Sequence, residues 1–547
     1  MTCRPSLILH ALIAAFSCFL LPNAAGAQNT GDNSSASAYR VSSLCYACHS
    51  NLKTATGEDV SIGKEWRGSL MANASRDPYW QGSVRREALD HPEVSGVIQN
   101  DCGSCHMPLQ HLRDKADGHE TEVFKYLPMK AELGPDSAPE DGVSCAVCHQ
   151  VEPTGLGTPA TYNGNFAVAP LTEHPRAAFG PFAANSDRAN QTHVVTTGYS
   201  IRPSSHMGDA GLCGSCHTLT TIARGPGGKE LGKLPEQMVY VEWLHSDYNG
   251  KQTCQQCHMP VAAGQVALAS LMSSPRDGLR RHTFTGANFL IEVMLDAHRD
   301  ELGVTAHSDE LAAAVERTTQ FLQSQSARVT LNTARVSGEE LTFAVKVENL
   351  TGHKLPTSFP SRRAWLHVTV IAADGQVVFE SGKLNPDGSI AGNANDTDPR
   401  RYSPHYTKIT KADEVQIFEP ILGDVDGHVT TGLLSAVQYL KDNRILPKGF
   451  DKNSAPAEIA VHGEASTDAG FIAGSSTTTY TINAGAAKGP FHIAAELVYQ
   501  PIGFRWAHNL EPYKEAEPER FVDYYNQAAA HSALVLTHAD AQMSAER

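Results

Sequence analysis

Every cysteine beyond the first eighteen residues belongs to the same five-residue motif. Two thiols are separated by two residues, and a histidine directly follows the second thiol. In chain order, the first to fifth motifs are Cys45–Cys48–His49, Cys102–Cys105–His106, Cys145–Cys148–His149, Cys213–Cys216–His217 and Cys254–Cys257–His258. Histidine makes up 25 of 547 residues. The probability that histidine follows all five cysteine pairs by chance is below about one in a million.

The C-x-x-C-H pattern is the attachment motif of c-type haem. Two thiols three positions apart form thioethers with the two vinyl groups on one edge of a porphyrin, and the adjacent imidazole binds the iron. Disulfides, redox-active dithiols and zinc sites also use C-x-x-C pairs, but none of them explains the histidines. Zinc sites built from two pairs would also leave one pair over. The sequence therefore predicts five covalently attached haem c groups, each with one iron.

Each haem iron takes a second axial ligand on its other face. Five of the 25 histidines belong to motifs and His10 lies in the leader, which leaves 19. This excess favours bis-histidine ligation, which is typical of low-spin iron in electron transfer. For any single histidine, the alternative is a solvated or hydrogen-bonded surface residue. By their context near the motifs, the candidate distal metal ligands are His282, His206, His245, His193, His174 and His91.

The first 27 residues have the pattern of a cleaved secretory signal. Arg4 precedes an apolar stretch over 7–21, and Ala25-Gly26-Ala27 precedes the predicted new N-terminus Gln28. The apolar stretch has about 15 residues, fewer than the roughly 20 that span a bilayer, so a membrane anchor is the weaker alternative. We expect a periplasmic or extracellular protein without stable membrane insertion. The formal charge of −15 argues against nucleic acid as a partner.

The expected fold class is α+β with several domains. Residues 28–300 are expected to form a pentahaem cytochrome c domain of helices and loops, in which the haems themselves form much of the core. A linker helix is expected at 301–327. Residues 328–547 are expected to form an immunoglobulin-like β-sandwich. In this part we predict a hairpin at Asp374-Gly375, further strands that include 458–461, 478–482 and 492–499, and a C-terminal helical segment at about 518–534.

Several phrases carry a family resemblance. They include Trp66-Arg-Gly-Ser69, Ala74-Ser-Arg-Asp-Pro-Tyr-Trp80, Asp141-Gly-Val-Ser-Cys145, Glu242-Trp-Leu244 and Thr351-Gly-His-Lys-Leu-Pro356 with Pro360-Ser-Arg-Arg363. With the five motifs, they resemble multihaem c-type cytochromes of bacterial respiration, related to the tetrahaem cytochrome of the nitrifiers, in a subgroup with a C-terminal β-domain. The resemblance implies electron transfer with mostly bis-histidine haems. Pentahaem nitrite reductases typically carry one C-x-x-C-K motif, and all five motifs here end in histidine, so that activity does not carry over.

The leading interpretation is an electron carrier between redox protein donors and acceptors, with no catalytic residue assigned. The alternative is a terminal reductase or oxidase of a small inorganic nitrogen or sulfur compound, which needs one haem with an open distal site. His353, Lys354, Arg362 and Arg363 form a basic cluster that suits such a site. Two other readings of this cluster stay open: His353 is itself a distal ligand, or the cations pair with haem propionates.

Overall fold

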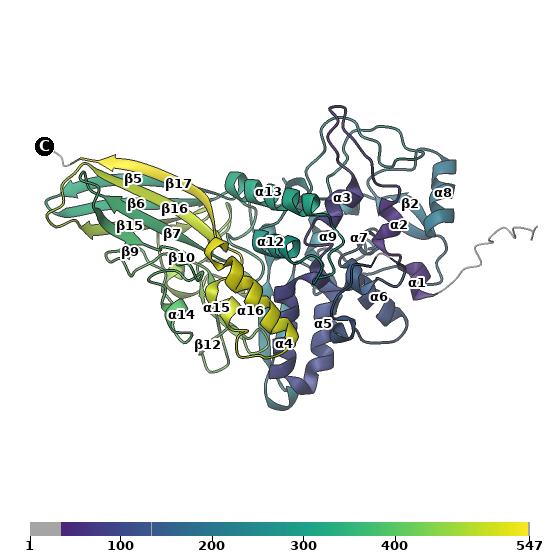
Figure 1. Ribbon diagram of the computed structural model, residues 1–547, viewed down its shortest axis with the longest axis horizontal. Coiled ribbons are helices and arrows are strands. Elements are labelled where there is room, and N and C mark those ends of the chain that lie inside the picture. The colour runs from purple at the N-terminus through teal and green to yellow at the C-terminus, as the bar shows by residue number, and fades with distance from the viewer. Residues whose placement is uncertain (1–33, 133, 545–547) are drawn as a thin grey trace, which may run out of the picture. The chain divides into compact units, whose positions relative to one another are not determined.

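Short helices joined by long loops make up the half of the chain that carries the five motifs (Figure 1). The structure, a computed structural model, describes residues 34–132 and 134–544. The predicted signal at 1–27 and the predicted N-terminus Gln28 lie outside the described residues. Within the described ranges, no helix combines the length and apolar composition needed to cross a bilayer.

Most helices of this half are too short to be stable in isolation, so they depend on tertiary packing. Two small sheets accompany them: β1 (Arg176–Gly180) pairs in parallel with β2 (Tyr199–Pro203), and β3 (Leu219–Arg224) pairs antiparallel with β4 (Glu230–Gln237). The helices are α1 Ser35–Ala38, α2 Ser42–Tyr46, α3 Ile62–Arg67, α4 Pro78–Asp90, α5 Ser95–His106, α6 Pro108–Ala116, α7 Cys145–Cys148, α8 Asp187–Thr197, α9 Ala210–Gly214, α10 Val239–Leu244, α11 Cys254–His258 and α12 Phe289–Ala297.

A longer helix, α13 (Ser308–Gln325), occupies the place of the linker helix expected at 301–327. A capping box starts it, because the His307 side chain and Glu310 satisfy each other's backbone N–H groups. Leu311 and Leu322 lie on its buried face and join the largest hydrophobic cluster of the molecule. The described residues form one compact unit, and the domain boundary near residue 300 remains a prediction.

Two five-stranded sheets dominate the C-terminal half, which makes the protein α+β. One sheet has the order β10-β7-β16-β17, with β8 paired to β7, and the other has the order β14-β15-β6-β5, with β9 paired to β15. The strands are β5 Ala327–Ser337, β6 Glu340–Asn349, β7 Arg363–Ile371, β8 Val377–Ser381, β9 Lys408–Ile409, β10 Ile417–Phe418, β14 Phe471–Ile472, β15 Ser475–Asn483, β16 Phe491–Gln500 and β17 Leu534–Met543. Alternate residues of β6 and β16 are buried in one shared cluster. An immunoglobulin-like topology remains a prediction.

Smaller elements complete this half. A three-stranded sheet has the order β12-β11-β13 and uses Val429–Thr430, Pro420–Gly423 and Gln438–Asp442. The remaining helices are α14 Ala394–Thr397, α15 Phe504–His508 and α16 Ala516–Ala528.

Most sequence-predicted strands of this half are confirmed, with one exception. The hairpin at Asp374-Gly375 joins β7 to β8, and Gly375 has the positive φ of 86° that such turns favour. The strand expected at 458–461 is wrong, because this segment forms a short 3₁₀ turn (Ala457–Ile459). The expected helix at about 518–534 is α16, and it is followed by β17, an unpredicted strand that pairs with β16.

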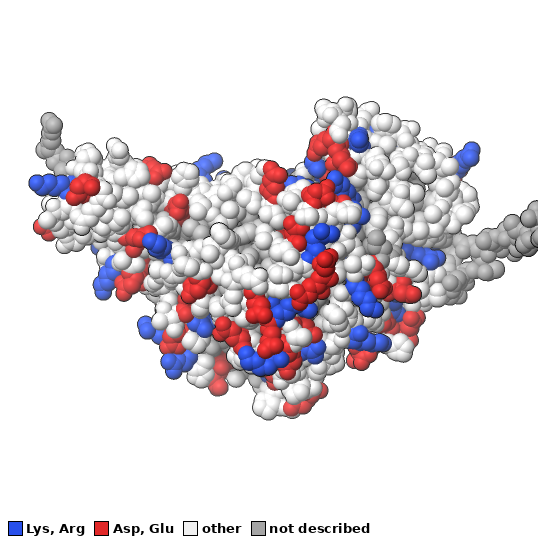
Figure 2. All heavy atoms as spheres, in the orientation of Figure 1, with Lys and Arg blue, Asp and Glu red and all other residues white. Residues whose placement is uncertain are grey.

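The C-terminal helix α16 packs on α4 of the motif-bearing half. Arg85 of α4 makes a bidentate ion pair with Glu517 of α16 at 2.8 and 2.9 Å, and Gly82 lets α4 approach the backbone at Pro518. Figure 2 shows acidic and basic side chains intermixed around α4 and α16, without a large field of one sign on this face. The end of the chain thus helps to hold a helix that borders the motifs.

Candidate cofactor-binding site

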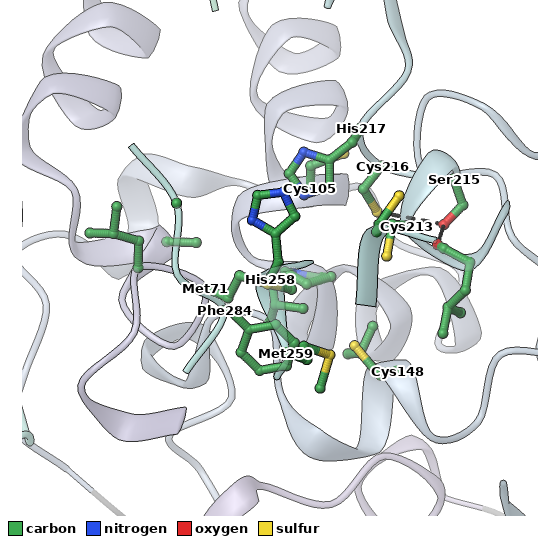
Figure 3. A pocket seen from close by; sticks show the side chains of 18 of the residues that line it. Met71, Cys105, Cys148, Cys213, Ser215, Cys216, His217, His258, Met259 and Phe284 are labelled. Atoms are coloured by element: carbon green, nitrogen blue, oxygen red, sulfur yellow. Dashed lines mark hydrogen bonds between the residues drawn. The ribbon is translucent and has the colours of Figure 1, made fainter. Parts of the chain in front are cut away.

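All five motifs line one cavity of about 1910 Å³. A pocket for one small molecule typically measures about 300–1,000 Å³, so this space suits several large ligands. Its lining includes all ten motif cysteines and all five motif histidines, with apolar side chains such as Phe284 and Met259 between them (Figure 3). The motifs therefore share one internal space.

Each motif occupies about one helical turn, which puts its three binding groups on one side. In the third motif, α7 spans Cys145–Cys148, and the backbone N–H of His149 donates to the carbonyl of Cys145 at 3.0 Å. Residues three and four positions apart share a helix face. The same hydrogen bond closes the turn in the first and fourth motifs.

Hydrogen bonds fix the tautomer of most motif histidines. A carbonyl only accepts, so a ring bonded to one through Nδ1 carries its proton there and leaves Nε2 free for a metal. The pairs are His49 Nδ1 with Leu268 O at 2.7 Å, His106 with Ala74 O at 3.2 Å, His149 with Phe179 O at 2.5 Å and His258 with Thr285 O at 2.6 Å. Among the described residues, His217 has no such partner. Burial lowers the pKa of His106 and His217 to about 4, so both rings stay neutral at pH 7, as metal ligation requires.

Two motif histidines face a second histidine at the spacing of a shared iron. The rings of His149 and His282 have centroids 6.4 Å apart and planes 16° apart, and those of His258 and His353 are 6.5 Å and 18° apart. A metal–nitrogen bond of about 2 Å on each side, plus about 1 Å from each nitrogen to its ring centre, gives about 6 Å. The Nδ1 atoms of His282 and His353 lie 3.0 and 2.9 Å from the carbonyls of Arg280 and Lys354. Each ring thus leaves Nε2 free for a metal.

Of the six predicted distal ligands, the structure brings His282 and His193 to the cavity. His193 lies on α8, and its Nδ1 is 2.8 Å from the carbonyl of Tyr199. After burial, it is among the groups that lower the pKa of His49, and it acts in the same way on His149. It therefore lies near the first and the third motif. Its Nε2 is left for a metal.

The other four predicted distal ligands do not line the cavity. Both ring nitrogens of His206 have partners, with Ser204 Oγ at 2.6 Å and Val151 O at 2.9 Å. His245 and His174 are exposed. The Nε2 of buried His91 lies 3.9 Å from Glu87.

Three cavity-lining histidines were not among the six predicted ligands: His111, His119 and His353. His111, on α6, has Nδ1 3.1 Å from Thr121 Oγ1. His353 lies in the loop between β6 and β7 and was considered only as an alternative. With the motif histidines, His193 and His282, ten histidines line the cavity, which is two for each motif. No local sequence pattern marks these three, and His353 comes from the other half of the chain.

Thiols of different motifs lie against one another inside the cavity (Figure 3). The pairs that meet are Cys45 with Cys145, Cys105 with Cys216, and Cys213 with Cys254. Hydrogen bonding to the neighbouring thiol, together with burial, raises the pKa of Cys45, Cys213 and Cys216. Cys148 lies close enough to raise the pKa of both thiols of the fourth motif. The fourth motif is therefore the neighbour of the second, third and fifth.

The basic cluster of the sequence divides between the cavity and the protein interior. Arg362 lines the cavity, and its Nη1 donates to the carbonyl of Thr357 at 3.1 Å. Lys354 and Arg363 instead form buried ion pairs with Asp442 and Asp396. Arg362 is the member of the cluster that remains available to an anionic group in the cavity.

Burial raises the pKa of three carboxyls that line the cavity. Burial raises the pKa of Glu236 to about 8 and that of Asp77 to about 6. Burial also raises the pKa of Glu87. The backbone N–H groups of Leu433 and Leu434, which donate to its carboxylate, oppose this effect only in part. At pH 7 Glu236 is therefore largely neutral, whereas Asp77 is largely ionised.

The donor set fits haem c better than zinc. Among the described residues, no three cysteine or histidine ligand atoms lie within 4.8 Å of one another, as a closed tetrahedral zinc site requires. The ten motif cysteines are free thiols. Paired thiols on one helical turn, neutral imidazoles with a free Nε2, and a large apolar cavity are what covalent haem attachment needs.

No family model and no curated protein matches this sequence. Among solved structures, the chain is similar to the penta-heme cytochrome c552 from Thermochromatium tepidum, with a TM-score of 0.49 and 16% sequence identity. The alignment covers 93% of this chain and 100% of that chain. A likeness at this level does not assign the chain to a family.

Proposed function

We propose that this protein is an exported pentahaem c-type cytochrome that relays single electrons between redox protein partners. The observation that carries the proposal is that all five C-x-x-C-H motifs line one cavity, in which two motif histidines face a second imidazole at the spacing of a shared iron. When bound, haem c supplies a reversible one-electron change at its iron.

Each group of cavity residues has its own role in this proposal. The ten motif cysteines hold the porphyrins as thioethers, and the five motif histidines are the proximal ligands. His282 and His353 are the distal ligands of the third and fifth haems, because they face His149 and His258. His193 is the distal ligand of the first haem. The carbonyls that accept from Nδ1 orient these rings.

The contacts between thiols support a sequence of haem-to-haem steps. Cys45 meets Cys145, and Cys148 lies near the fourth motif, so the first, third and fourth haems follow one another. The second and fifth haems adjoin the fourth through Cys105 and Cys254. A haem held by the fourth motif would thus have the haems of three other motifs as neighbours, which would make it the branch point of the proposed relay.

A second candidate is a haem enzyme acting on a small inorganic nitrogen or sulfur compound. The second and fourth motifs favour this candidate. Among the described residues, no second histidine ring lies opposite His106 or His217. Trp80 instead stacks on His106, with centroids 4.6 Å apart and planes 5° apart. Arg362 lies near enough to His217 to contribute, after burial and His258, to its lowered pKa. An open iron beside a cation is what such chemistry needs.

Low-temperature EPR of the oxidised protein, with a carbon monoxide difference spectrum of the reduced protein, separates the two candidates. The relay predicts only low-spin haems and no carbon monoxide adduct. One high-spin haem that binds carbon monoxide would favour the enzyme, and nitrite, hydroxylamine and sulfur oxyanions would then be tested as substrates.

A further inference from the structure

A closed network of buried charges surrounds the loop that carries His353. Lys354 Nζ lies 2.6 Å from Asp442 Oδ2, and Arg444 makes two bonds of 2.8 Å to the same carboxylate. Arg444 Nη1 then reaches Glu242 Oε1 at 3.1 Å. At most 6% of any of these four side chains is exposed. Two cations and two anions thus compensate one another away from water.

Glu242 connects the network to the loop that carries His353. Its Oε2 accepts the backbone N–H of Lys354 at 3.1 Å and the Thr357 hydroxyl at 2.5 Å. A second clamp comes from buried Asn349, whose amide donates to the carbonyl of His353 at 2.8 Å and to that of Ile445 at 2.9 Å. The residues around His353 are therefore fixed on both sides.

The network joins parts of the chain that are far apart in sequence. Glu242 lies on α10, shortly before the fifth motif, whereas Asp442 ends β13 and Arg444 follows it. Lys354 and His353 come from the loop between β6 and β7. The same loop directs the His353 ring at His258, at 6.5 Å between centroids.

Stability alone does not explain a buried network of charges well. Desolvation of four charges opposes their mutual attraction, and well-packed apolar side chains often stabilise a fold as well or better. A network of this kind instead fixes one geometry, because each charge tolerates few other arrangements. Its contacts fall on the residues next to His353, so the fixed geometry is that of the ring.

We propose that Glu242, Arg444, Asp442 and Lys354 are positioning residues for the sixth ligand of the fifth haem, so that the C-terminal β-region closes this haem by delivering His353. The inference rests on the proposed function, since it takes the fifth motif to hold a haem. It makes the coordination of one haem depend on contacts between the two halves of the chain.

The test compares holoprotein variants by low-temperature EPR, carbon monoxide binding and redox potentiometry. His353→Ala is expected to give one more high-spin, carbon monoxide-binding haem per chain than the wild type. Glu242→Gln, which leaves Arg444 without its second carboxylate, is expected to produce part of the same increase and to shift the midpoint potential of one haem. The other four haems keep their wild-type signals.

The matched control is Glu419→Gln. Glu419 pairs with Lys441 of β13 at 3.0 Å, and this pair is equally buried but does not contact the His353 loop. It is expected to lower the unfolding temperature without changing any haem. A second variant, Lys354→Met with Asp442→Asn, removes one cation and one anion together, so it tests the network without a net buried charge if Glu242→Gln does not accumulate.

Different results would contradict the proposed function and the positioning role. A wild-type protein with fewer than five covalent haems would overturn the proposed function. A wild type with five haems, whose spectra and potentials are unchanged in Glu242→Gln and in the Lys354–Asp442 double variant while unfolding temperatures fall, would overturn only the positioning role. Unchanged spectra in His353→Ala would overturn the ligand assignment itself.

Discussion

The imidazole rings of His149 and His282 face each other with 6.4 Å between centroids and 16° between planes. His149 belongs to the third motif, whereas His282 lies after the fifth in a segment without regular secondary structure. The backbone N–H of His282 is held by Glu65 at 2.9 Å, and its Nδ1 lies 3.0 Å from the carbonyl of Arg280. Hydrogen bonds thus hold both the backbone and the ring of His282 in place.

We predict that His282→Ala converts one of the five haems from low-spin to high-spin. The third iron loses its second imidazole, while the other irons keep theirs. His282→Met is expected to keep that haem low-spin and to raise its midpoint potential, because a thioether is a weaker donor than an imidazole. EPR and potentiometry measure both effects. A His282→Ala protein with unchanged spectra would contradict the assignment.

His206→Ala is expected to leave all haem spectra unchanged and to lower the free energy of unfolding by about 1–3 kcal/mol. The ring is buried and loses hydrogen bonds with Ser204 and Val151, but it does not line the cavity. His245→Ala is the control, since this side chain is exposed and surface changes typically stay within about 0.5 kcal/mol. Loss of a low-spin signal in the His206 variant would show that this ring is an iron ligand.

Glu292 gives a pH dependence of stability. It lies on α12, Oε1 accepts from the Thr318 hydroxyl at 3.0 Å, and burial raises its pKa from 4.5 to about 7. Below about pH 4.5 the carboxyl is protonated in both states. Between about pH 4.5 and 7 it ionises in the unfolded chain first, so the free energy of unfolding falls by about 3 kcal/mol as the pH rises.

Glu292→Gln is expected to remove this loss, so that the variant gains stability relative to the wild type as the pH rises from 4.5 to 8. Denaturant unfolding at several pH values measures the difference. Glu519→Gln, on the exposed side of α16, serves as the control. A difference between wild type and Glu292→Gln that does not vary with pH would contradict the prediction.

Asp77 begins the helix that brings Trp80 onto His106. Its carboxylate accepts the backbone N–H groups of Tyr79 and Trp80 at 2.8 and 3.1 Å. We predict that Asp77→Ala lowers the free energy of unfolding by about 1 kcal/mol, whereas Asp77→Asn, which also caps helices well, loses less. Equal losses in the two variants would show that the charge, and not the cap, supports α4.

The sequence was sufficient wherever a local pattern determines the structure. The spacing of the paired thiols and the adjacent histidine predicts one helical turn at each motif, and the structure has such a turn in the first, third and fourth motifs. Likewise α13, the alternating residues of β6 and the turn at Gly375 follow from periodicity and turn chemistry.

What the sequence did not predict depends on contacts between distant segments. β17 forms because β16 offers an edge for it, and its own residues carry weak strand signals. His353 faces His258 from a loop that a buried network ties to α10. His206 and His245 lie close to motifs along the chain, yet both ring nitrogens of His206 have other partners and His245 is exposed. Nearness to a motif in the sequence therefore does not decide which histidines line the cavity.

The central claim is that five haems are covalently attached to one chain. The most direct test is a pyridine haemochrome titration of the purified protein, together with the mass of the denatured chain, which retains thioether-linked groups. The account predicts five haems per chain by both measurements, and none released by acidic acetone. Fewer than five, or haem that is extracted on denaturation, would contradict it.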